Sequence, residues 1–473
     1  MVYLKKLNEL YNINDDRLIK GIKINSKEVE PGDIFVCTMG VTADRHDFID
    51  EAIKNGASAI VVSRDVGKKS VPVIKVDNTN LELRKLSAKF YDYPCEKACI
   101  IGVTGTNGKT TVAEIIFQLL GESCAYIGTN GKKYKDKKES IRNTCPDVDR
   151  LYMYFREFVD AGCNTICMEA SSEAFYRHRL DDIRYDIGIV TNITEDHLNI
   201  HKTLENYVDC KCQLVRQVKD DGYSILNSSD KYFDKFKREA HGNIVSYGYK
   251  DSDTLKIEDY TLKRDKTIIT FKYNNKTYEV TSPLLGSFNV DNLSSAILTL
   301  LCKSISFEEI VKRVSKIKQI EGRMEIMPFV SKYTVILDYA HTTDALDNIL
   351  TFLDMVKESR IITVTGSAGG RETTKRPGMG KVVLEKSDYV IFTMDDPRYE
   401  DPNKIIDDLV SGSDKTNYIR IVDRKKAIYK ALDMAEDNDI VLIAGKGRDD
   451  YMAIDDKYLP YCDYDVIKSY YEQ

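Results

Sequence analysis

The fold is decided by the stretch Gly102-Val103-Thr104-Gly105-Thr106-Asn107-Gly108-Lys109-Thr110-Thr111. The apolar residues 98–103 lead into it and predict a buried strand, and residues 110–120 predict the helix that follows. A glycine-rich turn between a strand and a helix can wrap its backbone N–H groups around phosphates. Val103 stands where the generic phosphate loop has its first glycine. Even so, Lys109 is placed to reach the β- and γ-phosphates of a nucleotide, and the Thr110 hydroxyl to bind Mg²⁺.

The composition around this stretch is that of an ordinary globular protein. The chain has 473 residues, 42% apolar and 30% charged, so about three domains are expected. A formal net charge of -6 without a basic block argues against nucleic acid as a partner. No segment is apolar over signal-peptide or membrane-spanning length, and the eleven cysteines include no C-x-x-C pair. We expect a cytoplasmic protein with reduced cysteines and no membrane contact, and we also expect a monomer.

Apolar runs alternate with helical patterns along the whole chain, which predicts an α/β fold in three parts. Residues 1–95 predict a small α/β domain, residues 96–321 a doubly wound central domain, and residues 322–473 a second open α/β sheet. Residues 255–282 alternate in the manner of an antiparallel hairpin at one edge of the central domain. The other strands are expected at residues 34–37, 59–62, 165–168, 187–190, 334–337, 360–364, 389–393 and 439–443.

The loop Thr-Gly-Thr-Asn-Gly-Lys-Thr-Thr, residues 104–111, resembles the ATP loop of the Mur ligase superfamily, and further motifs favour its MurE branch. This resemblance implies an α/β fold of three-domain Mur ligase architecture. Its parts are a UDP-binding N-terminal domain, a central P-loop ATPase domain and a Rossmann-like C-terminal domain that binds an amino acid. The further motifs are Asn25-Ser26-Lys27, residues 31–36 and 57–62, Met168-Glu169-Ala170-Ser171-Ser172, Thr191-Asn192-Ile193, Asp196-His197-Leu198, Asp338-Tyr339-Ala340-His341, Lys375-Arg376-Pro377, Asp395-Asp396-Pro397-Arg398 and Ala444-Gly445-Lys446-Gly447.

The resemblance also implies a reaction, the ATP-dependent addition of the third amino acid to UDP-MurNAc-L-Ala-D-Glu in peptidoglycan synthesis. Joining a carboxylate to an amine in water requires activation, which ATP provides as an acyl phosphate. Because the γ-phosphate and the carboxylate are both anions, Mg²⁺ and lysines are needed to offset their repulsion. The expected cofactors are therefore ATP and Mg²⁺, and the expected partners are a UDP-MurNAc-dipeptide and a free amino acid.

The site residues follow from the motifs, and the resemblance assigns their roles. Read alone, Lys211 would pass as a solvated helix lysine, Glu169 as a helix N-cap partner, and Asp338 and His341 as caps or surface residues. The catalytic set is Lys109, Glu169, His197, Lys211 and Arg323. ATP is assigned to Gly105, Thr106, Asn107, Gly108, Lys109, Thr110, Thr111, Asn292, Arg323, Asp338 and His341. Mg²⁺ is assigned to Thr110, Glu169, His197 and Lys211, the last carbamylated. Substrates are assigned to Ser26, Asn143, Thr144, Ser171, Arg177, Arg179, Arg371, Asp395, Asp396, Pro397, Arg398, Gly445 and Asp449.

Several substrate-facing positions depart from the usual MurE motifs, whereas the ATP and metal positions do not. Cys145 and Glu173 replace the usual Thr and His, and Asp396 and Asp449 replace the usual Asn and Glu. Cys145 and Glu173 leave open one alternative, a paralogue with another carboxylate acceptor. A further alternative is a nucleotide-binding scaffold without ligase activity, and the intact residues Lys109, Thr110, Glu169, His197 and Lys211 argue against it. We expect meso-diaminopimelate rather than L-lysine as the added amino acid, because Arg398 suits a distal carboxylate. The alternative is that Arg398 simply pairs with Asp396 or Glu400.

Overall fold

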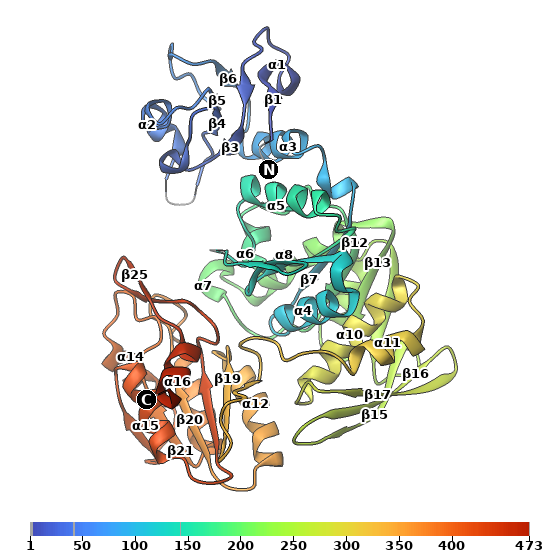
Figure 1. Cartoon of the computed structure of the whole chain (residues 1–473), viewed down its shortest axis with the longest axis vertical. Coiled ribbons are helices and arrows are strands. Elements are labelled where there is room, and N and C mark those ends of the chain that lie inside the picture. The colour runs from blue at the N-terminus through green and yellow to red at the C-terminus, as the bar shows by residue number, and fades with distance from the viewer. Residues whose placement is uncertain (1–2, 41–42, 142, 473) are drawn as a thin grey trace. The chain divides into compact units, whose positions relative to one another are not determined.

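A computed structural model describes residues 3–40, 43–141 and 143–472 of the chain (Figure 1). The chain divides into two compact units, each assembled from separate segments. The first contains residues 1–102, 121–187 and 217–219, and the second contains residues 103–120, 188–216 and 220–473. No helix in the described ranges has the length and apolarity needed to cross a membrane.

The first unit begins with a four-stranded sheet in the order β3-β4-β5-β6, in which all neighbours are parallel. Both faces of β4 and β5 are buried, which is why these two strands are continuous apolar runs in the sequence. The expected strand at residues 59–62 is confirmed, and the strand expected at 34–37 lies one residue earlier. The elements are β1 (Lys5–Lys6), α1 (Leu7–Leu10), β2 (Leu18–Ile19), β3 (Gly21–Lys23), β4 (Asp33–Val36), α2 (Ile49–Lys54), β5 (Ala59–Val62), β6 (Val73–Lys75) and α3 (Thr79–Phe90).

A second set of strands in the first unit carries several of the expected site residues. Strand β11 runs parallel to β8 and antiparallel strands β9 and β10 follow β8 toward the edge of the sheet. Helix α5 packs against α3 through Val148 and Tyr152. Strands β7 and β12 begin in the first unit and end in the second. The elements are β7 (Cys99–Thr104), β8 (Cys124–Gly128), β9 (Gly131–Tyr134), β10 (Lys137–Glu139), α5 (Val148–Asp160), β11 (Thr165–Glu169), α6 (Ser172–Tyr176) and β12 (Tyr185–Val190).

In the second unit the glycine-rich loop leads into α4, whose apolar face packs against α10. The segment expected to be a hairpin is a three-stranded antiparallel ribbon, in which β16 pairs with β15 on one side and with β17 on the other. That expectation was therefore one strand short. The elements are α4 (Lys109–Leu120), α7 (Leu198–His201), α8 (Leu204–Arg216), β13 (Val218–Asn227), α9 (Phe233–Glu239), β14 (Asn243–Gly248), β15 (Leu255–Leu262), β16 (Thr267–Tyr273), β17 (Lys276–Ser282), α10 (Phe288–Cys302) and α11 (Phe307–Val314).

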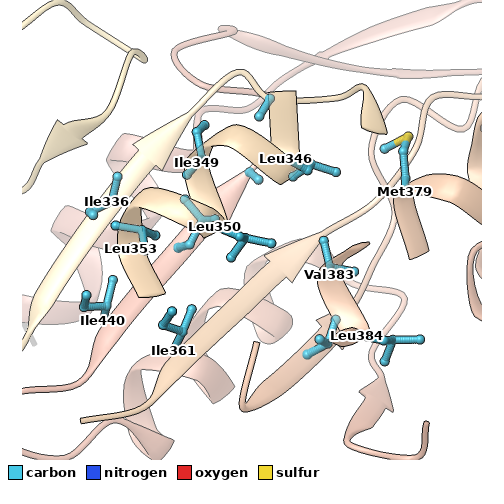
Figure 2. Close-up of a cluster of buried hydrophobic side chains, with 14 of the residues drawn as sticks. Ile336, Leu346, Ile349, Leu350, Leu353, Ile361, Met379, Val383, Leu384 and Ile440 are labelled. Carbon is cyan, nitrogen blue, oxygen red and sulfur yellow. The ribbon is translucent and has the colours of Figure 1, made fainter. Parts of the chain in front are cut away.

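The second unit ends with a six-stranded sheet in the order β18-β19-β23-β20-β21-β22, parallel except for β18. Apolar side chains of α12 and α13 fill one face of it (Figure 2), and those of α15 and α16 fill the other. The carboxyl ends of the parallel strands therefore lie along one edge, where α/β sheets bind ligands. The elements are β18 (Glu325–Ile326), β19 (Thr334–Asp338), α12 (Thr343–Val356), β20 (Ile361–Thr365), α13 (Arg376–Lys386), β21 (Tyr389–Phe392), α14 (Pro402–Val410), β22 (Tyr418–Arg420), α15 (Arg424–Met434), β23 (Ile440–Ala444), β24 (Tyr451–Ile454), β25 (Lys457–Pro460) and α16 (Asp463–Tyr471).

Candidate active site

Two glycines give the loop between β7 and α4 its path. Gly105 has φ +143°, and a Cβ built on it would lie 1.9 Å from the Thr191 hydroxyl oxygen. Gly108 has φ +87°, and its Cβ would lie 2.3 Å from Asn292 Oδ1. Both positions exclude a side chain by backbone conformation and by contact, so the loop can follow this path only with glycine at each of them.

Polar contacts from the chain after β12 hold this loop in place. The Asn107 N–H donates to Asn192 Oδ1 at 3.0 Å, and the Thr191 hydroxyl donates to the Asn107 carbonyl at 2.6 Å. The Thr106 hydroxyl lies 3.0 Å from the Tyr207 hydroxyl and donates to the Thr194 carbonyl at 3.0 Å. A loop fixed in this way is preorganised, so it loses little further freedom when an anion binds.

Lys109 and Lys211 converge on one backbone oxygen of the loop. Their Nζ atoms donate to the Gly105 carbonyl at 2.9 and 2.7 Å, and Lys109 also donates to the Thr106 carbonyl at 2.8 Å. Lys211 is only 1% exposed, so the interpretation of it as a solvated helix lysine was wrong. Two ammonium groups this close repel each other in a buried site, and an anion beside them relieves that repulsion.

His197 follows β12 in a left-handed conformation with φ 56°. Burial, together with the positive charges of Lys211 and Lys109, lowers its pKa to about 4, although Asp196 opposes the shift. The imidazole Nε2 lies 3.4 Å from the nearer Asp196 carboxylate oxygen. His197 is therefore neutral at pH 7, with a ring nitrogen available as an acceptor or ligand.

The segment after α11 supplies a cation to the same loop within the second unit. Arg323 donates from Nη2 to the Thr110 hydroxyl oxygen at 2.9 Å, and its guanidinium lies 4.6 Å from the Tyr339 ring centroid. Asp344, at the start of α12, accepts from the Asn107 side-chain amide at 3.0 Å. The structure thus brings Lys109, Thr110, Lys211 and Arg323 together at the loop. Sequence reasoning missed Asp344, for which no local motif existed.

Of the remaining residues assigned to ATP, Asn292 lies against the glycine loop, whereas Asp338 and His341 lie at and just after the end of β19. Asn292 on α10 is buried against Gly108 and donates to Asn289 Oδ1 at 2.9 Å. Both carboxylate oxygens of Asp338 accept backbone N–H groups, from Met324 and Ala340, each at 2.7 Å. His341 is exposed, and its Nδ1 lies 2.6 Å from the Tyr339 carbonyl. Asp338 therefore organises the chain at the end of β19, as a cap does.

Glu169 belongs to the first unit, where it ends β11 and is fully buried. Its Oε1 accepts from the Tyr126 hydroxyl and from the Thr129 N–H, each at 2.8 Å. The cap of α6 is Ser171, whose hydroxyl accepts from the Ala174 N–H at 3.2 Å. Glu169 is held rigidly at the carboxyl end of a buried strand, where a metal ligand is expected.

The first unit also holds the residues assigned to the nucleotide sugar and its peptide. The Thr144 hydroxyl lies 3.2 Å from that of Thr129, and Asn143 is exposed. Both arginines have acidic neighbours: Arg177 pairs with Glu173 and Arg179 with Asp147, each at 2.8 Å. The Ser26 hydroxyl donates to Glu51 at 2.5 Å.

The departures from the motif have structural partners. The Cys145 thiol donates to the Glu169 carbonyl at 3.0 Å and accepts from the Ser171 N–H at 3.3 Å. Cys145 therefore joins two of the segments that carry expected site residues. Glu173 forms an ion pair with the guanidinium of Arg177.

Substrate positions in the second unit surround a buried lysine at the carboxyl ends of β21 and β23. Lys446 Nζ lies 2.7 Å from Asp396, 3.8 Å from Asp395 and 3.7 Å from Asp449. Gly445 has φ +118°, and a Cβ there would lie 2.7 Å from Asp395 Oδ2. Sequence reasoning quoted Lys446 within a motif but assigned it no role; its position between two glycines after an apolar strand was the available signal.

The arginines expected in this region have few protein partners. Arg371 is exposed, and Arg398 follows the buried Pro397 in a left-handed conformation with φ 52°. Among residues 3–40, 43–141 and 143–472, no carboxylate pairs with Arg398. The alternative pairing was therefore wrong: Asp396 pairs with Lys446, and Glu400 with Arg376 at 2.8 Å.

A buried ion pair anchors this end of the sheet. Arg424 donates from Nε and Nη2 to the two carboxylate oxygens of Asp463 at 2.9 and 2.7 Å, and neither side chain is exposed. Nη2 also donates to the Ala444 carbonyl at 3.0 Å. The pair therefore fixes the backbone from which Gly445 and Lys446 continue.

The donors near the loop are compatible with a metal ion that is completed by other oxygens. No group of three or more His, Cys, Asp or Glu side chains that could hold a metal occurs in the part of the chain that the structure describes. A Mg²⁺ ion at Thr110, or between His197 and Lys211, would need oxygens from a nucleotide or from a modified lysine. The neutral imidazole of His197 supports the fit.

The strand, the rigid glycine loop and the convergent lysines define the class first: an α/β protein built to bind phosphates. Three family models then match the chain in order. They are "Mur ligase family, catalytic domain" over residues 18–91, "Mur ligase middle domain" over 103–300 and "Mur ligase, glutamate ligase domain" over 322–447. The chain belongs to the Mur ligase family, and it is an ATP-dependent ligase.

Several relatives match over nearly the whole chain. The UDP-N-acetylmuramoyl-L-alanyl-D-glutamate–2,6-diaminopimelate ligase of Fusobacterium nucleatum is 40% identical, covering 97% of this chain and 95% of that protein. The enzyme of the same name from Aquifex aeolicus is 38% identical over 95% and 93%. A solved structure with that name aligns with a TM-score of 0.68 at 27% identity, covering 99% of both chains. The MurF ligase of Thermotoga maritima, solved with ADP, shares the fold at 20% identity and a TM-score of 0.66, covering 90% and 93%.

Proposed function

We propose that this ligase joins a diamino acid, meso-diaminopimelate, to the γ-carboxyl group of D-glutamate in UDP-MurNAc-L-Ala-D-Glu, with ATP and Mg²⁺. The names of the relatives, and their similarity to this chain over nearly its full length, support this substrate pair. The observation that carries the choice of amino acid is the guanidinium of Arg398, which no carboxylate in the described ranges neutralises. Such a group suits a distal carboxylate and would repel a lysine ammonium.

The reaction has two steps, and the residues at the loop serve the first. The D-glutamate carboxylate attacks the γ-phosphorus of ATP, and the bond between this phosphorus and the bridging β–γ oxygen breaks. The products of this step are ADP and an acyl phosphate. Lys109 and Arg323 are cations that contact the loop, and they offset the repulsion between the two anions. When bound, Mg²⁺ would neutralise phosphate charge, and we assign it to Thr110, Glu169, His197 and carbamylated Lys211.

In the second step the amine of the incoming amino acid attacks the acyl carbon, and the tetrahedral adduct expels phosphate to leave an amide. The amine must lose a proton, and the incoming residue must be held by its charged groups. Asp395, Asp396 and Asp449 lie around Lys446 at the sheet edge, and Arg371 and Arg398 lie on neighbouring loops. We assign the amino acid to this group of residues.

The burial of Lys211 supports its carbamylation. An unmodified ammonium there lies beside Lys109 at one carbonyl, at an electrostatic cost in a buried site. Carbamylation replaces that cation with an anionic group, which removes the repulsion and supplies an oxygen ligand for Mg²⁺. Intact-mass measurement under bicarbonate, with Lys211→Arg as the control, tests this proposal.

The sugar and peptide of the acceptor are assigned to the first unit, to Ser26, Asn143, Thr144, Ser171, Arg177 and Arg179. The Glu173–Arg177 pair favours a second candidate, a related ligase whose acceptor carries less negative charge near Arg177, because one expected anion-binding group is already neutralised. We place either reaction in the cytoplasm and expect a monomer to perform it.

Phosphate release distinguishes these candidates. The purified enzyme is assayed with ATP, Mg²⁺ and UDP-MurNAc-L-Ala-D-Glu against meso-diaminopimelate, L-lysine and a panel of other amino acids. Release that depends on both the dipeptide substrate and meso-diaminopimelate is expected. Release with another acceptor only would establish the second candidate, and equal or higher kcat/KM for L-lysine would overturn the choice of amino acid.

A further inference from the structure

Lys446 is a fully buried cation whose surroundings are almost entirely acidic. It follows β23, and three carboxylates from two different loops lie within 3.8 Å of its Nζ. The Tyr451 ring centroid lies 5.2 Å from the same Nζ. Burial alone lowers the pKa of this ammonium, but the nearby carboxylates of Asp395 and Asp396 raise it overall, so Lys446 stays charged at pH 7.

The carboxylates of Asp396 and Asp449 differ in their contacts within the protein and in their exposure. Asp396 Oδ1 accepts from Lys446 at 2.7 Å and from the Ala453 N–H at 3.0 Å, and its side chain is 9% exposed. Asp449, at 3.7 Å from Lys446, is 32% exposed. Asp396 is thus committed to an internal ion pair, whereas Asp449 retains surface that a ligand can reach.

This arrangement sets the charge that an incoming side chain meets. The one lysine and three carboxylates form a cluster with a surplus of acidic groups. Arg398 lies two residues after Asp396, and its backbone N–H donates at 3.0 Å to the carbonyl of Ala453, the residue whose own N–H binds Asp396. With Lys446 charged, acidic and basic groups are both available, which suits an end group bearing both an ammonium and a carboxylate. Without it, Asp396 adds an uncompensated negative charge that favours a lone ammonium.

We infer that Lys446 is a positioning and specificity-determining residue: by neutralising Asp396 it makes the site prefer a zwitterionic side-chain end over a cationic one. The inference rests on the proposed function, since it concerns the amino acid of that reaction. Lys446 acts through Asp396, and its effect falls on the choice between amino acids. The use of ATP is unaffected.

Charge-changing variants with opposite expected effects test this inference. The ratio of kcat/KM for meso-diaminopimelate to that for L-lysine is measured in the whole enzyme, with the KM for ATP as a second readout. Lys446→Met is expected to lower the ratio by about tenfold, as expected for one uncompensated charge near the substrate. Asp396→Asn is expected to raise it, and Lys446→Met with Asp396→Asn to return it toward the wild-type value, with the KM for ATP unchanged throughout.

The control is Lys426→Met, which removes an exposed lysine from α15 and should leave the ratio unchanged. A ratio that stays constant in both Lys446→Met and Asp396→Asn overturns the inference while the proposed function stands. If Lys446→Met does not fold, the comparison of Asp396→Asn with the double variant still decides, because a purely structural lysine predicts the same ratio in both. Wild-type enzyme that uses neither diamino acid overturns the proposed function and this inference together.

Discussion

Alanine in place of Gly105 perturbs the phosphate loop at the oxygen on which both lysines converge. The new Cβ would lie 1.9 Å from the Thr191 hydroxyl oxygen, on a residue with φ +143°. Overpacking in a well-packed region costs about 1–3 kcal/mol. A left-handed backbone costs an alanine about 1–2 kcal/mol. Together these contributions predict a loss of about 2–5 kcal/mol from the free energy of unfolding or, where the loop shifts instead, from nucleotide binding.

A companion variant separates the two contributions. Gly105→Ala with Thr191→Ala, compared with Thr191→Ala alone, removes the contact with the hydroxyl and leaves the backbone strain and the 3.1 Å approaches to the Asn192 backbone N and O. Thermal denaturation with and without ADP, and calorimetric titration of ADP, are the assays. We expect ADP affinity to fall at least tenfold in Gly105→Ala, which corresponds to about 1.4 kcal/mol, and to recover in part in the double variant. A Gly105→Ala enzyme with wild-type melting temperature and ADP affinity would refute the reasoning.

Four further changes have definite expected results. Lys109→Ala should abolish phosphate release while circular dichroism stays that of the wild type, since it removes at least a few kcal/mol of transition-state stabilisation. Lys211→Ala should be nearly inactive, with acetate or another short carboxylic acid restoring part of the turnover and bicarbonate restoring none. Arg424→Met should lower the free energy of unfolding by about 3–5 kcal/mol, because it leaves Asp463 buried without its partner; an unchanged melting temperature contradicts this. Burial, with the charges of neighbouring carboxylates, raises the pKa of Asp449 to about 6. The kcat/KM for the amino acid should therefore rise as the pH increases through 6, and this rise should be absent in Asp449→Asn.

The phosphate loop could be predicted because its signal is local. The strand, glycine turn and helix occupy about twenty consecutive residues, and the structure shifts their bounds by one residue to Cys99–Thr104 and Lys109–Leu120. The parallel strands of the four-stranded sheet that contains β5 and of the six-stranded sheet that contains β23 could be predicted equally well, because strands buried on both faces are unbroken apolar runs.

The environment of the site residues could not be predicted, because it depends on contacts between distant segments. The Gly105 carbonyl that Lys211 reaches lies 106 positions earlier in the chain, so nothing around Lys211 indicates its burial. Lys446 and Asp396 are 50 positions apart, and their pairing left Arg398 without the partner that sequence suggested. Roles that resemblance assigns thus stay predictions until the partners of each side chain are tested.

The division into two compact units has a consequence for any attempt to dissect the enzyme. The polypeptide passes from one unit to the other five times, at residues 102, 120, 187, 216 and 219, so neither unit corresponds to a single coding segment. A fragment covering residues 220–473 would contain Asn292, Arg323 and Lys446 but would lack the phosphate loop, Lys211 and the helix that packs on α10. We therefore expect such a truncation to expose apolar surface and to aggregate or to require chaperones, and activity to be unrecoverable by mixing halves cut at the predicted domain boundaries.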